Sequence, residues 1–262
     1  MSLALIIAGL ATGLLLGILG SGGSIITLPA LIYLLDVAPK PAIAMSLGIV
    51  GLTASMATVH HFIKGNVNVS VALVFSVFGA MGTFAGARIG VLMPEILQLG
   101  LFAAIMYFAA YYMLKNTQAA AVQACVKADG ATTTSIETLS GRRLGHIAGH
   151  GIVVGILTGI VGVGGGFLIV PSLVLLSNIP MKQAVGTSLA IIAVKSFAGF
   201  AGYAGSVTID YPLMASFVSI AIVGGVTGGY FCQYLSAKLL KKSFAIFLVL
   251  VATYIIFKEF LN

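Results

Sequence analysis

The sequence predicts an all-α polytopic membrane protein that is built from two inverted repeats of five helical segments each. Three observations support this fold class: a shortage of charge, a series of long apolar runs, and a glycine-rich motif that recurs in the second half. The 262 residues include only 13 Lys or Arg and 6 Asp or Glu, and 60% are hydrophobic. Soluble domains carry about 25% charged residues, against 7% here. A water-soluble enzyme, a nucleic-acid-binding protein and a disordered chain are therefore all disfavoured.

The first half contains five apolar runs, at residues 3–20, 23–36, 41–63, 69–92 and 94–115. A transmembrane helix needs about 20 apolar residues, and the last three runs reach that length. The first run is marginal, and the second covers only about 21 Å of a hydrocarbon core about 30 Å thick. A glycine-rich segment separates these two, so we expect a glycine-broken or re-entrant pair of short helices. No basic residue precedes the first run, which favours a helix of the mature protein over a cleaved signal peptide.

The stretch from Asn116 to Arg143 is the only long polar part of the chain. Its polar composition is typical of a linker that is partly disordered. It divides the chain into a first repeat (1–115), a linker (116–143) and a second repeat (144–262). In the second repeat, apolar runs resume at 145–162, 165–178, 181–204, 210–235 and 240–260. The second of these is again too short to cross the membrane, and it again follows a cluster of glycines.

The two halves match when the first is shifted by 142 residues. Without a gap, Gly20, Gly22, Gly23, Pro29 and Leu31 fall on Gly162, Gly164, Gly165, Pro171 and Leu173; Lys40, Ala42, Ser46 and Leu47 fall on Lys182, Ala184, Ser188 and Leu189; and Gly82 and Gly86 fall on Gly224 and Gly228. A two-residue gap brings Gly65–Val67 onto Gly205–Val207. Chance similarity between apolar helices would not keep Gly, Pro, Lys and Ser in one register. The match therefore indicates an internal duplication.

The distribution of cations predicts the orientation. If the short pair returns the chain to its starting side, each half crosses the membrane an odd number of times and the second half is inverted. One side then collects nine cations, Lys64, Lys115, Lys127, Arg142, Arg143, Lys182, Lys238, Lys241 and Lys242, and the other collects three, Lys40, Arg88 and Lys258. A single broken crossing in place of the pair would divide them six against six. The positive-inside rule therefore predicts a protein of the cell's inner (plasma) membrane with a cytoplasmic linker and both termini outside.

The paired glycine clusters predict a binding site for an anion. They comprise Gly22, Gly23 and Ser24 in the first repeat, and Gly164, Gly165 and Gly166 in the second. Glycine lets the backbone approach a ligand closely, and a helix start presents unpaired N–H groups and a partial positive charge. Discontinuous helices of this kind bind anionic groups in secondary transporters. The alternative is that the glycines only let helices pack closely, which their repetition in the same register disfavours.

The positions of the ionisable residues also indicate a negatively charged substrate. All six acidic residues, Asp36, Glu95, Asp129, Glu137, Asp210 and Glu259, lie at the ends of runs or in the linker. Cation transporters usually place such residues inside the membrane. Lys195, by contrast, lies near the middle of an apolar run, where a Lys costs about 2.5–3.5 kcal/mol to insert. An anionic substrate would supply its partner; the alternative is that Lys195 snorkels or donates to backbone carbonyls.

Polar residues complete the candidate site. Ser46 and the pair Thr187–Ser188 recur at matching repeat positions, so we expect them to line the substrate path. His60 and His61 end the third run. Because neutral His gains a proton near physiological pH, they are candidates for proton coupling, but a position at the cytoplasmic interface is the simpler interpretation.

These features resemble the sulfite exporter TauE/SafE family. The resemblance rests on the Gly-x-Gly-Gly-Gly-x-x-x-x-Pro pattern from Gly162 to Pro171, its degenerate copy from Gly20 to Pro29, and three further motifs. Those are Gly186–Leu189, Gly65–Asn68 and Gly224–Gly229. The resemblance covers essentially the whole chain. It implies a multi-pass transporter of small sulfur-containing anions, such as sulfite and organosulfonates, built as two repeats.

Three positions depart from the pattern of that family. Ser24 stands where the second motif has Gly166, Asn68 stands where many relatives have an acid, and Lys195 stands where a neutral polar residue is common. These departures concern the choice of substrate and of the coupling ion.

The sequence therefore predicts a secondary transporter of a small anion, with export favoured over import. One repeat-derived bundle would move against the other to give alternating access. A passive anion channel and a membrane-embedded enzyme or accessory subunit are the alternatives, although no catalytic constellation and no metal-ligand spacing is found. The sequence predicts no cofactor and no nucleic-acid partner. Small-residue faces occur throughout, so a homodimer is compatible with the sequence.

Overall fold

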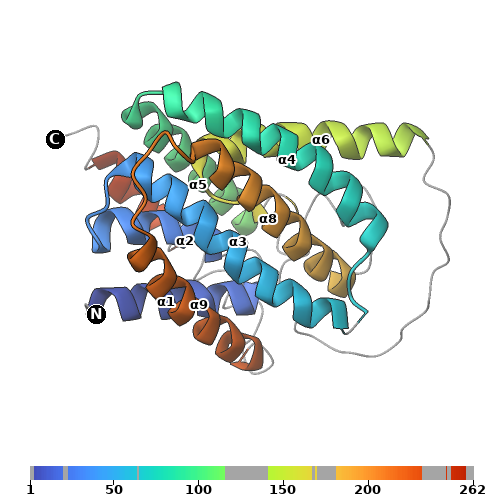
Figure 1. The fold of residues 1–262 in the computed structure, drawn as a ribbon, viewed down its shortest axis with the longest axis horizontal. Helices are drawn as coiled ribbons and strands as arrows, with labels where there is room; N and C mark the ends of the chain where they lie inside the picture. The colour runs from blue at the N-terminus through green and yellow to red at the C-terminus, as the bar shows by residue number, and fades with distance from the viewer. Residues whose placement is uncertain are drawn as a thin grey trace.

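The computed structural model describes residues 3–19, 23–63, 65–115, 141–166, 169, 181–231, 246 and 249–257. The described residues form helices and turns, and no strand occurs among them (Figure 1). The elements are α1 (Leu3–Leu19), α2 (Gly23–Pro29), a π-helix η1 (Ala30–Leu34), α3 (Pro39–Ile63), α4 (Val69–Leu92), α5 (Glu95–Lys115), α6 (Gly141–Val161), α8 (Met181–Tyr203) and α9 (Tyr211–Phe231). The predicted all-α class is confirmed for this part of the chain.

Helix boundaries follow the apolar runs closely. α4 occupies the run 69–92, and α6 differs most, because it begins at Gly141, inside the segment that the sequence assigns to the linker. The run 165–178 lies outside the described residues except for its first two positions and 169, and the run 240–260 is described only at 246 and 249–257.

Three described helices are long and apolar enough to cross a membrane: α3, α4 and the segment Tyr211–Gly228 of α9. The first two elements are shorter, as the sequence predicts. α1 has 17 residues, or about 25 Å, and α2 with η1 covers about 18 Å. Pro29 ends α2 and is followed at once by the π-helix. Proline removes a backbone donor, and in membrane helices a local π adjustment can re-satisfy the backbone groups that it frees.

The helices run in two opposite directions. In Figure 1, α1, α3 and α9 run from left to right, whereas α4, α6 and α8 run from right to left. Contacts between α3 and α8 agree with this: Gly48 lies against Phe200 and Gly51 lies against Phe197, so residue numbers rise along one helix as they fall along the other. The three matched pairs that the structure describes, α1 with α6, α3 with α8 and α4 with α9, therefore run in opposite directions.

On α4, small residues make up most of the buried side, and large apolar residues occupy the exposed side. On α4 the exposed side includes Leu73, which is 62% exposed, and Met81, which is 64% exposed. Its buried side carries Gly79, Gly82, Thr83, Gly86, Ala87 and Gly90. This is the pattern of a helix surrounded by lipid, because lipid tails solvate large apolar groups and small residues let helix backbones approach closely.

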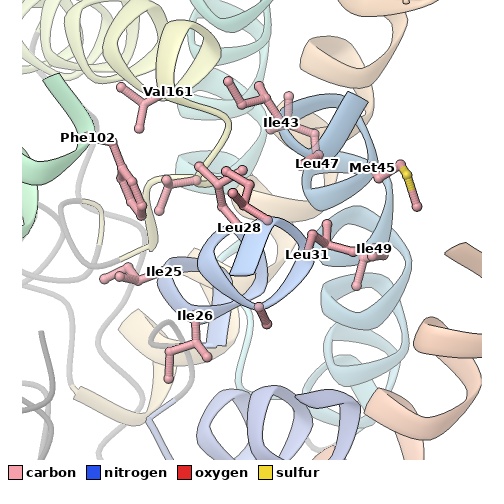
Figure 2. Packing of buried hydrophobic residues seen from close by; sticks show 14 of the residues in the cluster. Ile25, Ile26, Leu28, Leu31, Ile43, Met45, Leu47, Ile49, Phe102 and Val161 are labelled. Atoms are coloured by element: carbon pink, nitrogen blue, oxygen red, sulfur yellow. The ribbon is translucent and has the colours of Figure 1, made fainter. Parts of the chain in front are cut away.

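The largest buried cluster surrounds the short segment formed by α2 and η1. Leu28 and Leu31 are fully buried, and Leu28 lies between Phe102 of α5 and Leu47 of α3 (Figure 2). A segment too short to cross the membrane is thus enclosed by other helices. This fits the rule that irregular backbone at membrane depth must be buried in protein or line a cavity.

Close helix crossings occur in two copies that are related by the shift of 142 residues. A Cβ on Gly82 would lie 2.5 Å from the carbonyl oxygen of Ile152, and a Cβ on Gly224 would lie 2.7 Å from that of Leu10. Adding 142 to Gly82 and Leu10 gives Gly224 and Ile152. The same relation holds for Gly86 with Ile156 and Gly228 with Leu14, for Gly9 with Phe217 and Gly151 with Phe75, and for Gly13 with Ala221 and Gly155 with Gly79. The pair α1 and α9 therefore repeats the packing of the pair α6 and α4.

Turn glycines follow the same alignment. Gly65 after α3 and Gly205 after α8 both have left-handed backbone conformations, with φ of +69° and +78°. These two positions match only when the two-residue gap of the sequence alignment is included. The structure thus agrees with the register of the duplication, including the gap.

Candidate functional site

The glycine cluster after α6 forms a tight turn. Gly162, Gly164 and Gly165 have φ of +77°, +63° and +67°, a backbone conformation that glycine adopts without strain. The N–H of Gly162 donates to the carbonyl of Thr158 at 2.9 Å and ends the helix. A Cβ on Gly162 would lie 2.5 Å from Cγ2 of Ile43. The glycines are therefore required both by the backbone conformation and by the narrow space between α6 and α3.

The corresponding segment of the first half is described only in part. Gly22 lies outside the described residues, and so does the side chain of Ser24. Gly23 begins α2 and is buried, and a Cβ there would lie 2.6 Å from the carbonyl oxygen of Thr12. Gly166 is the first described residue after the turn that has a helical conformation. The start of α2 and the turn after α6 are thus both enclosed by neighbouring helices.

Ser46 lies directly against the glycine turn. Its side chain is fully buried, and its hydroxyl donates to the carbonyl of Gly162 at 2.6 Å and to that of Ile43 at 2.8 Å. One hydroxyl proton serves both acceptors. The sequence prediction that Ser46 belongs to the site is thus compatible with its place, and its contacts in this structure are with the backbone.

Removal of the Ser46 hydroxyl should loosen the contact between α3 and the glycine turn. We expect Ser46→Ala to lower the free energy of unfolding in detergent by about 1 kcal/mol, the size of an interhelical hydrogen bond in membrane proteins. Ser55→Ala is the matched control, since Ser55 donates only to Gly51 of its own helix. Denaturant titration of both variants checks this, and equal losses would contradict a special role for Ser46.

Thr187 lies far from Ser46. Its hydroxyl accepts the N–H of Asn68, which precedes α4, and the side chain of Asn68 in turn accepts the N–H of Val71. The neighbouring Gly186 lies against His61, which is 15 residues, or about 22 Å along a helix, from Ser46. Ser188 is fully buried beside Thr187. The structure therefore does not bring Ser46 and the Thr187–Ser188 pair together.

The two histidines lie at the end of α3. Their ring centroids are 6.0 Å apart with the planes at 90°, and His60 is exposed. The starts of α4 and α8 lie at the same end of the bundle (Figure 1). A position at one end of the bundle is compatible with the interface interpretation, which stays a prediction.

Lys195 is the only fully buried cation among the described side chains. Its exposed fraction is 0%, and its Nζ has no hydrogen-bond partner within the described part of the protein. Its aliphatic stem packs on Gly79 of α4: a Cβ there would lie 2.8 Å from Cδ and 3.1 Å from Cγ. Ser196, also 0% exposed, has a hydroxyl without a partner in the same described set. Two adjacent residues of α8 therefore carry buried polar atoms that nothing described satisfies.

Two threonines that the sequence analysis missed lie between α8 and the glycine turn. The hydroxyls of Thr83 and Thr158 are 3.5 Å apart, and both side chains are buried. A Cβ on Gly199 would lie 2.8 Å from Cγ2 of Thr83, and one on Gly165 would contact Cγ2 of Thr158. Thr is common in apolar helices as a residue that bonds its own backbone, so the sequence offered no signal that separates these two from the rest.

A second missed group surrounds the last turn of α6. Gln98 of α5 donates to the carbonyl of Ile160 at 3.0 Å, and the hydroxyl of Tyr203 of α8 donates to the same carbonyl at 3.1 Å. Gln98 also donates to the Tyr203 hydroxyl at 3.0 Å. Gln98 is 1% exposed and Tyr203 is 0% exposed. The only available signal was a single amide inside an apolar run.

The described residues include no group of three or more His, Cys, Asp or Glu that could hold a metal ion. What they form is an array of apolar helices with a glycine turn, an enclosed short segment and a buried cation. Helices of this length and polarity, with many large apolar side chains exposed, define a polytopic helical membrane protein.

The chain belongs to the family described as Sulfite exporter TauE/SafE, whose model matches residues 5–255. The predicted family is thus confirmed. A probable membrane transporter protein of Xylella fastidiosa is 30% identical, over 96% of this chain and 94% of that protein. The probable membrane transporter protein YdhB of Bacillus subtilis is 25% identical, over 90% of this chain and 91% of its own length. No solved structure matches. The family and the names of these relatives indicate a membrane transporter and not an enzyme.

Proposed function

We propose that the protein is a secondary transporter of a small sulfur-containing anion, sulfite or an organosulfonate, and that it works as an exporter. The observation that carries the proposal is Lys195, a completely buried ammonium group for which the described residues supply no hydrogen-bond acceptor. A Lys at the centre of a transmembrane helix costs about 2.5–3.5 kcal/mol. A bound anion would offset this cost, because ion pairing and charge-assisted hydrogen bonds satisfy the ammonium.

The glycine turn supplies the second part of the proposed site. Gly164 has no Cβ, so an anion can approach its backbone closely, and backbone N–H groups in such turns form concave anion sites. The N–H groups of Gly162 and Gly165 donate to the carbonyls of Thr158 and Val163, so the proposed contact is with the N–H groups of the remaining turn residues. The Thr83–Thr158 pair lies between this turn and α8, where Lys195 lies. We therefore propose that the anion lies between Lys195 and the turn. The hydroxyls of Thr83 and Thr158 donate to the carbonyls of Gly79 and Gly155 in this structure, and each would have to rotate to donate to an oxygen of the anion.

We propose an inverted-repeat architecture for alternating access. It is supported by the reversed direction of the three matched helix pairs that the structure describes and by the four pairs of glycine crossings that the shift of 142 residues relates. Each close crossing joins one helix from each half, α1 with α9 and α4 with α6. Separating the halves would break these crossings. We therefore infer that the moving bodies are the two mixed pairs, and not the two halves that the sequence analysis proposed.

We propose that the linker lies in the cytoplasm. The end of α3 and the starts of α4, α6 and α8 lie at one end of the bundle (Figure 1), and four of the nine clustered cations, Lys64, Arg142, Arg143 and Lys182, lie at or next to these helix ends in the sequence. The chain has two cysteines, and in Cys232→Ser only Cys125 of the linker would remain. A membrane-impermeant maleimide should leave this variant unlabelled in intact spheroplasts and label it after permeabilisation. Labelling of intact spheroplasts would reverse the proposed orientation.

Counterflow in proteoliposomes tests the transport function. Vesicles preloaded with an unlabelled anion should accumulate the same labelled anion transiently, because a carrier exchanges its substrate across the membrane without net flux. Sulfite, sulfoacetate, taurine, sulfate and thiosulfate form the panel. Saturating counterflow of sulfite or a sulfonate supports the proposal. Flux that does not saturate and shows no counterflow would identify a passive channel, and no flux of any member would contradict the anion transporter.

A further inference from the structure

The carbonyl oxygen of Ile160 is held by two side chains from two other helices. The amide of Gln98 and the hydroxyl of Tyr203 both donate to it, at 3.0 and 3.1 Å. Ile160 lies two residues before Gly162, the first residue of the glycine turn with a positive φ. The last carbonyls of a helix have no partner within the helix. These two hydrogen bonds, from α5 and α8, therefore hold the end of α6 in place.

A glycine of α4 leaves room for the side chains of Gln98 and Tyr203. A Cβ on Gly90 of α4 would contact the Tyr203 hydroxyl and would lie 2.8 Å from the amide nitrogen of Gln98. Only glycine at this position leaves room for both polar groups. Side chains from α5 and α8, and a glycine of α4, thus meet at the end of α6, in a region where Gln98 is 1% and Tyr203 0% exposed.

Burying the polar groups of Gln98 and Tyr203 costs free energy of desolvation, which indicates a role beyond packing. A buried polar group must be hydrogen-bonded to avoid a large desolvation penalty, and the carbonyl oxygen of Gln98 has no hydrogen-bond partner among the described residues. A Leu at position 98 and a Phe at position 203 would avoid this penalty. The amide of Gln98 and the hydroxyl of Tyr203 nevertheless both donate to the carbonyl of Ile160, just before the turn.

We propose that Gln98 and Tyr203 are positioning residues for the glycine turn Gly162–Gly166. They hold the end of α6 so that the backbone N–H groups of the turn keep their orientation toward the anion. This inference rests on the proposed function in one respect, namely that the turn contacts the substrate. Neither residue needs to touch the anion itself.

Two variants test the inference. Gln98→Leu removes the amide, and Tyr203→Phe keeps the buried ring and removes only the hydroxyl, so at least the second should fold. We expect each to raise the anion concentration for half-maximal counterflow by about threefold to tenfold, the loss that corresponds to one hydrogen bond. The maximal rate should change less than twofold, because neither substitution alters the crossing of α1 with α9 or that of α4 with α6. Ser216→Ala is the control, since Ser216 is only partly buried and donates to Pro212 of its own helix.

Hydrogen exchange supplies a measurement that needs no substrate. Peptides that cover residues 158–166 should exchange faster in Gln98→Leu and Tyr203→Phe than in the wild type, whereas Ser216→Ala should leave them unchanged. Unchanged exchange in both variants would overturn the inference. So would faster exchange without any change in half-saturation, since the turn would then move without affecting the anion. Failure of the proposed function would look different: the wild type itself would transport no member of the panel, whatever the exchange rates.

Discussion

Replacing Lys195 by Met should stabilise the ligand-free protein and remove most of the stabilisation that a bound anion gives. Met has an unbranched chain that can follow the stem of the lysine across Gly79, and it carries no charge. Exchanging a buried charge for an apolar group of similar shape often stabilises by about 1–4 kcal/mol. Loss of the charge-assisted contact, worth about 1.5–3 kcal/mol, should weaken anion affinity about 10- to 100-fold. Thermal unfolding with and without sulfite or sulfoacetate measures both effects.

The opposite signs of these two effects separate a binding residue from a structural one. A lysine that only donates to backbone carbonyls would leave those carbonyls unpaired when replaced, so the ligand-free protein would lose stability. Lys40→Met is the matched control, because Lys40 donates to the carbonyl of Val91 at 3.2 Å at the end of α4. That variant should lose a little stability and keep its affinity. Unchanged ligand stabilisation in Lys195→Met would refute the role of the lysine.

Gly79→Ala approaches the same site from the facing helix. The new methyl group would lie 2.8 Å from Cδ of Lys195, which is too close, so the stem must shift and the ammonium moves with it. We expect weaker anion binding without the gain in stability that Lys195→Met gives. In the repeat alignment, Gly79 matches Ala221, and Lys195 matches Thr53. The half with the shorter side chain, Thr53, thus has Ala in place of Gly. The absence of a side chain at position 79 therefore leaves room for the longer side chain of Lys195.

The sequence was sufficient to predict where the helices lie and how the halves align. Apolar runs bounded by Gly, Pro and polar residues predict helix ends within a few residues, as for α4 and α8. The alignment of Gly82 with Gly224 also proved meaningful, because both glycines meet the carbonyl of a matching residue. Periodicity could not predict which helices pack together, since helices with apolar residues on every side give no single buried face.

The candidate site was only partly predictable, for a geometric reason. Ser46 and Ser188 match in the repeat, but matched helices run in opposite directions, so a residue off the middle of one helix has its counterpart displaced toward the other end. Ser46 meets the glycine turn after α6, whereas Thr187 meets the start of α4. Gln98 and Tyr203 lie 105 residues apart. No local pattern could pair them before the packing of α5, α6 and α8 was known.

Alanine at Gly82 and at Gly224 should destabilise the protein by similar amounts. The added Cβ would lie 2.5 Å from the carbonyl oxygen of Ile152 in the first case and 2.7 Å from that of Leu10 in the second. Both contacts involve backbone, which cannot rotate away as a side chain can, so the two helices must separate. Overpacking of this kind costs about 1–3 kcal/mol. Denaturant titration in detergent measures the loss, and Gly225→Ala is the control, because its nearest atom, the carbonyl oxygen of Gly13, lies at an ordinary 3.6 Å.

The comparison between the two variants tests the architecture more sharply than either loss alone. The crossings of α4 with α6 and of α1 with α9 share no residue, so the double variant should lose about the sum of the single losses. If the two mixed helix pairs are the moving bodies, each variant should also slow counterflow. Half-saturation should stay unchanged in Gly224→Ala, because the crossing of α1 with α9 does not include the Thr83–Thr158 pair. Destabilisation by Gly82→Ala alone would mean that the two pairs are not equivalent. In that case the bundle could not move as two matched pairs, and alternating access would have to arise from α4, α6 and α8 alone.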